Sequence, residues 1–181
     1  MMRSLALLMA LSLGLAHGQN PPTRVRGTIA SFDGRTLSVD NVVRVTVTDR
    51  TEIVYAQPIP LGDIKAGDFL GVTSVRRGGT LTAVEVRRFP KPLNPGHRPL
   101  DGKDDQTMTN ATVEAAVEAT NQRELTMSYE GGKQKIIVPQ DAAISTLVPG
   151  TRAQLVPGAP VNLSADGDLN AQRIQVGPPR K

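Results

Sequence analysis

The chain carries one pattern of apolar and turn residues twice, and this internal repeat is its strongest constraint. A shift of 88 places residues 25–39 (VRGTIASFDGRTLSV) over residues 113–127 (VEAAVEATNQRELTM), and a shift of 91 then joins the middle of the two copies. The aligned pairs are Val25 with Val113, Ile29 with Val117, Leu37 with Leu125, Val47 with Val138, Ile53 with Ile144, Ala83 with Ala171 and Val86 with Ile174. Two copies of one pattern predict two similar structural units.

Each copy is predicted to consist of β-strands. Apolar residues alternate with polar ones in 25–29 and again in 43–47, and Asp33-Gly34 stands between two such runs, which is a strong hairpin signal. The matching segments of the second copy are 113–119, 124–129 and 133–138. Alone, residues 111–125 could form a helix because they are rich in Ala and Glu; their alignment with the hairpin favours strands.

The end of each copy predicts a bent strand. A strand through Val75, a turn over residues 76–79 and a last strand from Thr80 follow from the pattern of glycines and alternating aliphatic residues. In the last strand the period of two slips by one residue between Ala83 and Val86, and it slips again between Ala171 and Ile174. An extra residue at the same place in both copies predicts a β-bulge, which bends a strand so that a small sheet can close.

These segments resemble a known family. The run GTIASFDGRTLSV, then VTVTDRTEI, then DIKAGDFLGVTSVRRGGTLTAVEV is similar to the bacterial exported family called domain of unknown function 5666. The resemblance covers residues 25–89 well and 111–176 in outline, since Gly67-Asp68 becomes Gly150-Thr151 in the second copy. It implies small OB-like β-barrels in an envelope or secreted protein, and it brings no established catalytic residues.

The first eighteen residues are typical of a secretory signal peptide. Arg3 precedes an uncharged run from Ser4 to Ala16, and Ala16-His17-Gly18 forms a small-x-small cleavage signal. We expect cleavage between Gly18 and Gln19 and a periplasmic or secreted protein. The run is short for a membrane span, and no later segment approaches the roughly 20 apolar residues that a spanning helix needs. We therefore expect no transmembrane segment.

The strongest candidate for a specific site lies between the two copies. Removal of the signal would leave His97 as the one histidine, and Asp101, Asp104 and Asp105 follow it closely. Imidazole and carboxylate groups together are able to bind a divalent metal ion. However, the spacing fits neither a calcium loop nor a His-x-x-x-His pair. The alternative is a solvated connector, because residues 89–100 (FPKPLNPGHRPL) contain four prolines.

Other kinds of chemistry find less support in the sequence. The absence of cysteine excludes disulfides and thiolate sites, and no Gly-x-Ser-x-Gly motif indicates a serine nucleophile. The formal net charge of +4 raises the question of nucleic-acid binding, and two features argue against it. Single-strand binders need aromatic stacking platforms, for which this chain has few aromatic residues, and the pairs Arg76-Arg77 and Arg87-Arg88 are expected at opposite ends of a strand. A basic face is better suited to an anionic envelope component or to another exported protein.

The sequence thus predicts an all-β protein of two tandem, antiparallel, OB-like barrels. The expected parts are a signal peptide (1–18), a first barrel (24–90), a proline-rich polar connector (91–107) and a second barrel (108–178). The expected function is that of a non-catalytic, exported binding or structural module without a cofactor. The first alternative is a ligand- or metal-binding protein that uses the connector and the cleft between the units, and the second is an enzyme of unknown class.

Overall fold

A computed structural model describes residues 22–100, 103–119 and 122–179; the predicted signal peptide lies outside these ranges. The described residues are almost entirely β, with two short 3-10 turns, η1 (Leu61–Asp63) and η2 (Arg152–Gln154), and no α-helix. None of them forms a helix long and apolar enough to cross a membrane. The strands are β1 (Thr23–Phe32), β2 (Thr36–Val39), β3 (Val43–Thr46), β4 (Glu52–Pro58), β5 (Phe69–Arg77), β6 (Thr80–Phe89), β7 (Gly96–Leu100), β8 (Lys103–Ala119), β9 (Gln122–Tyr129), β10 (Gly132–Ile137), β11 (Ala143–Pro149), β12 (Pro160–Ala165) and β13 (Ala171–Val176).

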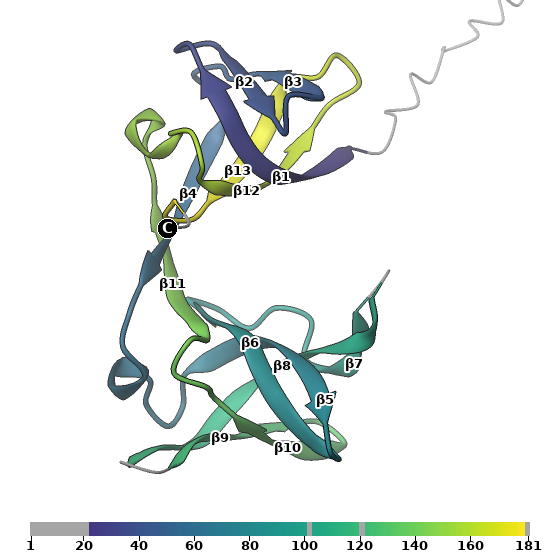
Figure 1. Ribbon diagram of the computed structural model, residues 1–181, viewed down its shortest axis with the longest axis vertical. Helices are drawn as coiled ribbons and strands as arrows, with labels where there is room; N and C mark the ends of the chain where they lie inside the picture. The colour runs from purple at the N-terminus through teal and green to yellow at the C-terminus, as the bar shows by residue number, and fades with distance from the viewer. Residues whose placement is uncertain (1–21, 101–102, 120–121, 180–181) are drawn as a thin grey trace, which may run out of the picture.

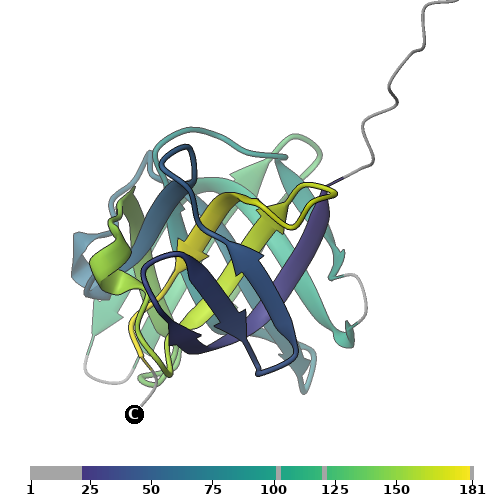
Figure 2. The same cartoon turned by 90° about the horizontal axis from the view of Figure 1, so that it is seen from above.

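The strands form two closed rings, one above the other in Figure 1. In the β1 ring the strands follow one another in the order β1, β2, β3, β13 and β12, and β12 pairs with β1 again. In the β8 ring the order is β8, β9, β10, β6 and β5, and β5 pairs with β8. Four pairings of each ring are antiparallel, and the remaining contact is parallel. In the β8 ring it is the pairing of β10 with β6, and in the β1 ring it is a single bridge between Thr46 of β3 and Asn170, the residue just before β13. The view from above shows the β1 ring lying over the β8 ring (Figure 2).

The rings do not coincide with the two sequence repeats. One core combines Ile29 and Leu37 of the first copy with Leu163 and Ile174 of the second. The other core combines residues such as Val72 and Val86 with residues such as Leu125 and Ile136 in the same way. The prediction of one barrel from 24–90 and one from 108–178 was therefore wrong, because each copy gives its first three strands to one ring and its last two to the other. An alternating pattern shows which face of a strand is buried and does not show which partner buries it.

The chain crosses between the rings along β4 and β11, which pair antiparallel in Figure 1. Pro58 lies opposite Ser145, Ala56 opposite Leu147 and Val54 opposite Pro149. Ala56 and Leu147 occupy the same place in the two copies under the shift of 91. The ladder is therefore self-complementary, and a pseudo-twofold axis runs through the Ala56–Leu147 pair.

Several local predictions are confirmed. The hairpin between β1 and β2 turns at Asp33-Gly34, where the Asp33 carboxylate accepts hydrogen bonds from the backbone N–H groups of Arg35 (2.9 Å) and Thr36 (2.7 Å) and Gly34 takes a φ of 97°. The described residues 111–119 and 122–125 lie in strands β8 and β9, as predicted. The ladders slip opposite Val84 in β6 and opposite Gln172 in β13, which confirms the bulge in both copies.

The alignment of the first strands needs a correction. Ile29 bonds to the loop before β12, since its N–H donates to the carbonyl of Ala159, and Val113 bonds in the same way to Asp68 before β5. Ile29 is thus equivalent to Val113, whereas the sequence alignment paired it with Val117. The cause is the hairpin of the second copy, whose ladder continues from Ala116–Leu125 to Ala119–Gln122. The first hairpin ladder ends at Phe32–Leu37.

The predicted connector is also partly wrong. We expected residues 91–107 to form an extended, solvated spacer, but Gly96–Leu100 form β7 and β8 already begins at Lys103. β7 pairs antiparallel with β8, so that Gly96 lies opposite Asn110 and Pro99 opposite Thr107. In the described part of this segment, the proline-rich residues 90–95 alone run without regular structure.

The two repeats exchange strands, in that each completes the ring of the other. This exchange predicts which engineered cysteines can form a disulfide. Thr73 in β5 lies opposite Met108 in β8. The Val113 N–H points toward β5, so alternate residues of β8 do the same and Met108 does not. Thr73 and Met108 therefore form a non-hydrogen-bonded pair, in which the Cα atoms lie about 4.5 Å apart. This distance is within disulfide range. The chain has no cysteine of its own. We predict that Thr73→Cys/Met108→Cys forms a disulfide under oxidising conditions, as seen by mobility on a non-reducing gel and by thiol titration.

The matched control is Met108→Cys/Ser164→Cys. Ser164 is the residue that would face Met108 if each repeat closed on itself, because Arg24, the equivalent of Met108, lies opposite Ser164 in the observed structure. This control pair should keep its free thiols. A disulfide in the control and none in the first variant would contradict the exchange.

Candidate functional site

The structure places His97 in a strand pair. His97 lies opposite Thr109 in the β7–β8 ladder, and its Nδ1 is 2.8 Å from the Thr109 hydroxyl. Partial burial lowers the pKa of the imidazole, and the charge of Arg76 lowers the pKa further. Both effects favour the neutral imidazole. The contact with Thr109 contributes to the docking of β7 on β8.

The acidic residues predicted to join His97 are not brought to it within the described residues. Asp105 is exposed and lies four residues along β8 from Thr109, about 13 Å in an extended strand. Asp101 and the side chain of Asp104 lie outside the described part of the chain. No group of three potential metal ligands occurs in the described residues. The metal site remains a prediction from the sequence.

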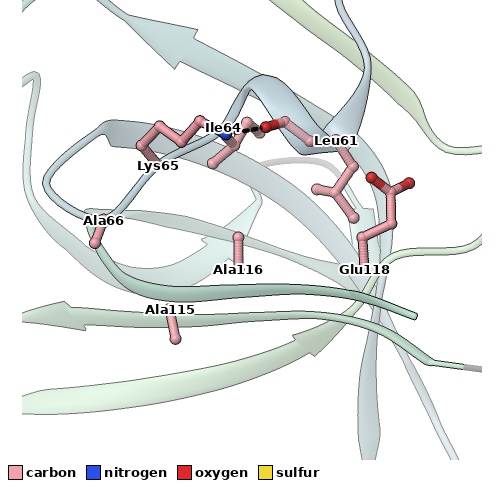
Figure 3. Close-up of a pocket in the computed structure, with 8 residues that line it drawn as sticks. Leu61, Ile64, Lys65, Ala66, Ala115, Ala116 and Glu118 are labelled. Carbon is pink, nitrogen blue, oxygen red and sulfur yellow. Dashed lines mark hydrogen bonds between the residues drawn. The ribbon is translucent and has the colours of Figure 1, made fainter.

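A small pocket of about 320 Å³ lies between η1 and β8. In Figure 3 Ala116 and Glu118 of β8 point toward the turn that carries Leu61. The charged side chains that line the pocket already have partners. The Lys65 ammonium donates to the carbonyl of Gly62, and Glu118 pairs with Arg123 at 3.5 Å. Leu61 and Ile64 belong to the core of the β8 ring. This pocket therefore lies at the edge of the hydrophobic core, and its paired polar groups make it a poor candidate for ligand binding.

A larger groove of about 710 Å³ lies between the two rings. One wall is the outer face of the β1 ring, the floor includes the β4–β11 ladder, and the other wall is the connector segment Phe89–Leu93. We call this the inter-ring groove. Its lining residues are Arg24, Arg26, Glu52, Ile53, Val54, Phe89, Pro90, Lys91, Pro92, Leu93, Leu147, Val148, Pro149, Asn162, Leu163, Ser164, Arg173 and Gln175.

The first wall consists of two cross-strand rows. One row runs from Arg24 through Ser164 and Arg173 to Glu52. The other runs from Arg26 through Asn162 and Gln175 to Val54. Side chains opposite each other in neighbouring strands share a face, and the intervening residues of β1 and β12, such as Val25 and Leu163, point into the core. Strand alternation thus gathers these polar side chains on the groove.

The second wall is fixed to the β8 ring. The Asn110 side chain donates hydrogen bonds to the carbonyls of Leu93 (3.0 Å) and Asn94 (3.1 Å). Phe89 covers Gly71, where a Cβ would lie 2.6 Å from the aromatic ring. Gly71 is the counterpart of Asn162 in the pseudo-twofold arrangement. The connector therefore covers the face of the β8 ring that corresponds to the open face of the β1 ring.

The groove carries an excess of positive charge. Four of its lining residues are cationic, namely Arg24, Arg26, Lys91 and Arg173, and one, Glu52, is anionic. Glu52 pairs with Arg173 at 3.2 Å. Within the described residues Arg24, Arg26 and Lys91 make no ion pair and their side chains are exposed. An anion in the groove would meet cations that have no other partner there.

Sequence reasoning missed these residues. The adjacent arginines at 76–77 and 87–88 are the more conspicuous pairs in the sequence, and the β5–β6 register places them at opposite ends of the hairpin. The alternation of Arg24 and Arg26 with Val25 did indicate a polar outer face. The approach of Arg173 from the other copy could not be predicted, because it depends on the exchange.

Residues 26–87 match the family described as Domain of unknown function (DUF5666). This confirms the resemblance found in the sequence for the first copy. The matched segment runs from β1 into β6, so in this structure it is shared between both rings. No curated protein and no solved structure matches the chain.

The contact between Phe89 and Gly71 predicts a stability effect with a built-in control. In Gly71→Ala the new methyl group would collide with Phe89 and with the Asn110 amide, 3.0 Å away. We expect a loss of about 1–3 kcal/mol in the free energy of unfolding. Asn162→Ala, at the equivalent and uncovered position, should change it by less than about 0.5 kcal/mol. Urea unfolding measures both, and equal losses would contradict the covering role of the connector.

Proposed function

We propose that this chain is an exported, non-catalytic binding module that takes an anionic ligand in the inter-ring groove. The proposal starts from geometry, because the matching family has no known function. The observation that carries it is a set of cationic side chains, Arg24, Arg26 and Lys91, that form no ion pair with any described residue and surround a groove with an apolar floor. Charge of one sign in a groove raises the local concentration of an oppositely charged ligand.

The lining of the groove supports binding rather than catalysis. Among the residues that the structure describes, the lining contains one carboxylate, Glu52, and no histidine. General acid–base chemistry and glycoside hydrolysis depend on titratable groups placed at the reacting bond, commonly two carboxylates. Glu52 is exposed and already pairs with Arg173 at 3.2 Å.

Export is the second part of the proposal. It is supported by the pattern of residues 1–18. We expect the protein recovered from the periplasm or the culture medium of a bacterial host to begin at Gln19, as measured by N-terminal sequencing. Recovery of the uncleaved chain from the cytoplasm alone would contradict export.

Ligand binding is tested with polyanions of known composition. Poly-L-glutamate and dextran sulfate, with neutral dextran as the control, are titrated at low salt, and binding is measured by calorimetry and by shifts of backbone amide resonances. We expect the polyanions to shift resonances of β1, β12 and β13, and neutral dextran to shift none. The affinity should fall as salt is added, because salt screens exposed charges.

A pair of charge-matched variants separates the groove from general surface charge. Arg24→Gln/Arg26→Gln removes two groove cations, and Arg44→Gln/Arg77→Gln removes two exposed cations elsewhere. We predict about tenfold weaker binding in the groove variant, which corresponds to about 1.4 kcal/mol, and less than twofold change in the control. Equal weakening in both variants would mean non-specific attraction and would overturn the groove as the site.

A further inference from the structure

The two rings differ at one strand edge. In the β8 ring, β7 pairs with the stretch of β8 from Thr107 to Asn110, on the edge of β8 opposite to β5. The equivalent stretch of the β1 ring is Thr23 to Arg26 in β1. Its other edge pairs with β12, and β2 pairs only from Ile29 onward. Among the described residues no strand occupies the place in the β1 ring that β7 occupies in the β8 ring.

The backbone groups at this open edge follow from the phase of the ladder. Ile29 directs its N–H toward Ala159, on the β12 side, so Val25 and Gly27 also point toward β12. Thr28 points the other way: its N–H donates to the Asp40 carboxylate (2.8 Å) and its carbonyl accepts from the Asp40 N–H (2.9 Å). Arg24 and Arg26 therefore present their N–H and C=O groups to the open edge.

We propose that this edge of β1 binds an extended acidic peptide segment of a partner protein, which adds as an antiparallel strand as β7 adds to β8. The inference rests on the proposed anion-binding groove and names its partner. Unpaired strand edges are ready templates for a further strand. The chain shows the geometry itself, because Gly96 lies opposite Asn110 and Arg98 opposite Met108, the counterparts of Arg26 and Arg24.

The charges define the sequence that fits. Peptide residues opposite Arg24 and Arg26 share the face of these arginines, so they should be acidic. They are two positions apart, and the residue between them lies on the face of Val25, which is buried in the core. The expected pattern is acidic, apolar, acidic. A second copy of β1 fits poorly, because antiparallel pairing would place Arg24 and Arg26 against the same two arginines and like charges opposite each other are unfavourable.

The peptide acetyl-(Glu-Val)4-amide tests the proposal, with binding to the purified protein measured by calorimetry. Its Glu residues occupy the positions whose N–H groups face β1. N-methylation of the Glu amides should abolish measurable binding, whereas N-methylation of the Val amides, which face away, should leave the affinity within about threefold. Both peptides have the same charge and composition. Equal effects of the two modifications would overturn strand addition.

A backbone variant tests the same edge from the protein side. Arg26→Pro removes the N–H that faces the open edge, and it keeps every N–H donor of the β1–β12 ladder. Arg26→Gln has the same charge and serves as the reference. We expect Arg26→Pro to bind the peptide at least about fivefold more weakly than Arg26→Gln, which corresponds to the loss of one hydrogen bond. Dextran sulfate should bind both variants alike.

The remaining outcomes are distinct. If Arg26→Pro unfolds, the N-methylated peptides decide the question with the unmodified protein. If the Arg24→Gln/Arg26→Gln variant binds polyanions as well as the wild type, the groove proposal itself fails. If the variants Arg26→Gln and Arg26→Pro bind the peptide equally, only strand addition fails. A peptide-free dimer that Arg26→Pro dissociates would show that a second copy occupies the edge and would overturn the proposal.

Discussion

The antiparallel ladder between β4 and β11 is the interaction on which the rest of the structure depends. It carries the chain out of one ring and back into it, and it pairs equivalent residues across a pseudo-twofold axis at Ala56 and Leu147. Because the two crossing strands lie side by side, each repeat completes the core of the other repeat's ring. Neither ring can bury its apolar face with strands of one repeat alone, so the two rings should fold as one cooperative unit.

Much of the local structure could be predicted from the sequence, and the partners of the strands could not. The turn at Asp33-Gly34 and the bulges near Val84 and Gln172 follow from residue types and from a slip in alternation, which are local signals. The exchange leaves no such signal, because β5 and β12 are similar strands and either would satisfy the alternation of β1. The tandem boundaries and the register of the first strand were wrong for this reason. β7 was missed because Pro95 precedes it and Pro99 lies within it, and prolines are rare in strands other than edge strands.

The same exchange decides what the candidate site is. The sequence drew attention to His97 because it is a lone histidine near carboxylates, yet the structure uses it to dock β7 on Thr109. The inter-ring groove instead combines Arg24 and Arg26 of one repeat with Arg173 of the other. Each of these arginines, taken alone, is an ordinary polar residue of a strand. Their chemistry appears only when strands from distant parts of the chain lie next to each other.

The exchange of strands is tested most directly by nuclear Overhauser effects between α-protons. Arg26 and Asn162, and likewise Asn110 and Gly71, are non-hydrogen-bonded antiparallel pairs, in which the two Cα atoms approach most closely. The account predicts strong Hα–Hα effects within these two pairs. Effects between Arg26 and Gly71 and between Asn110 and Asn162, with none in the predicted pairs, would show that each repeat closes on itself and would contradict the account.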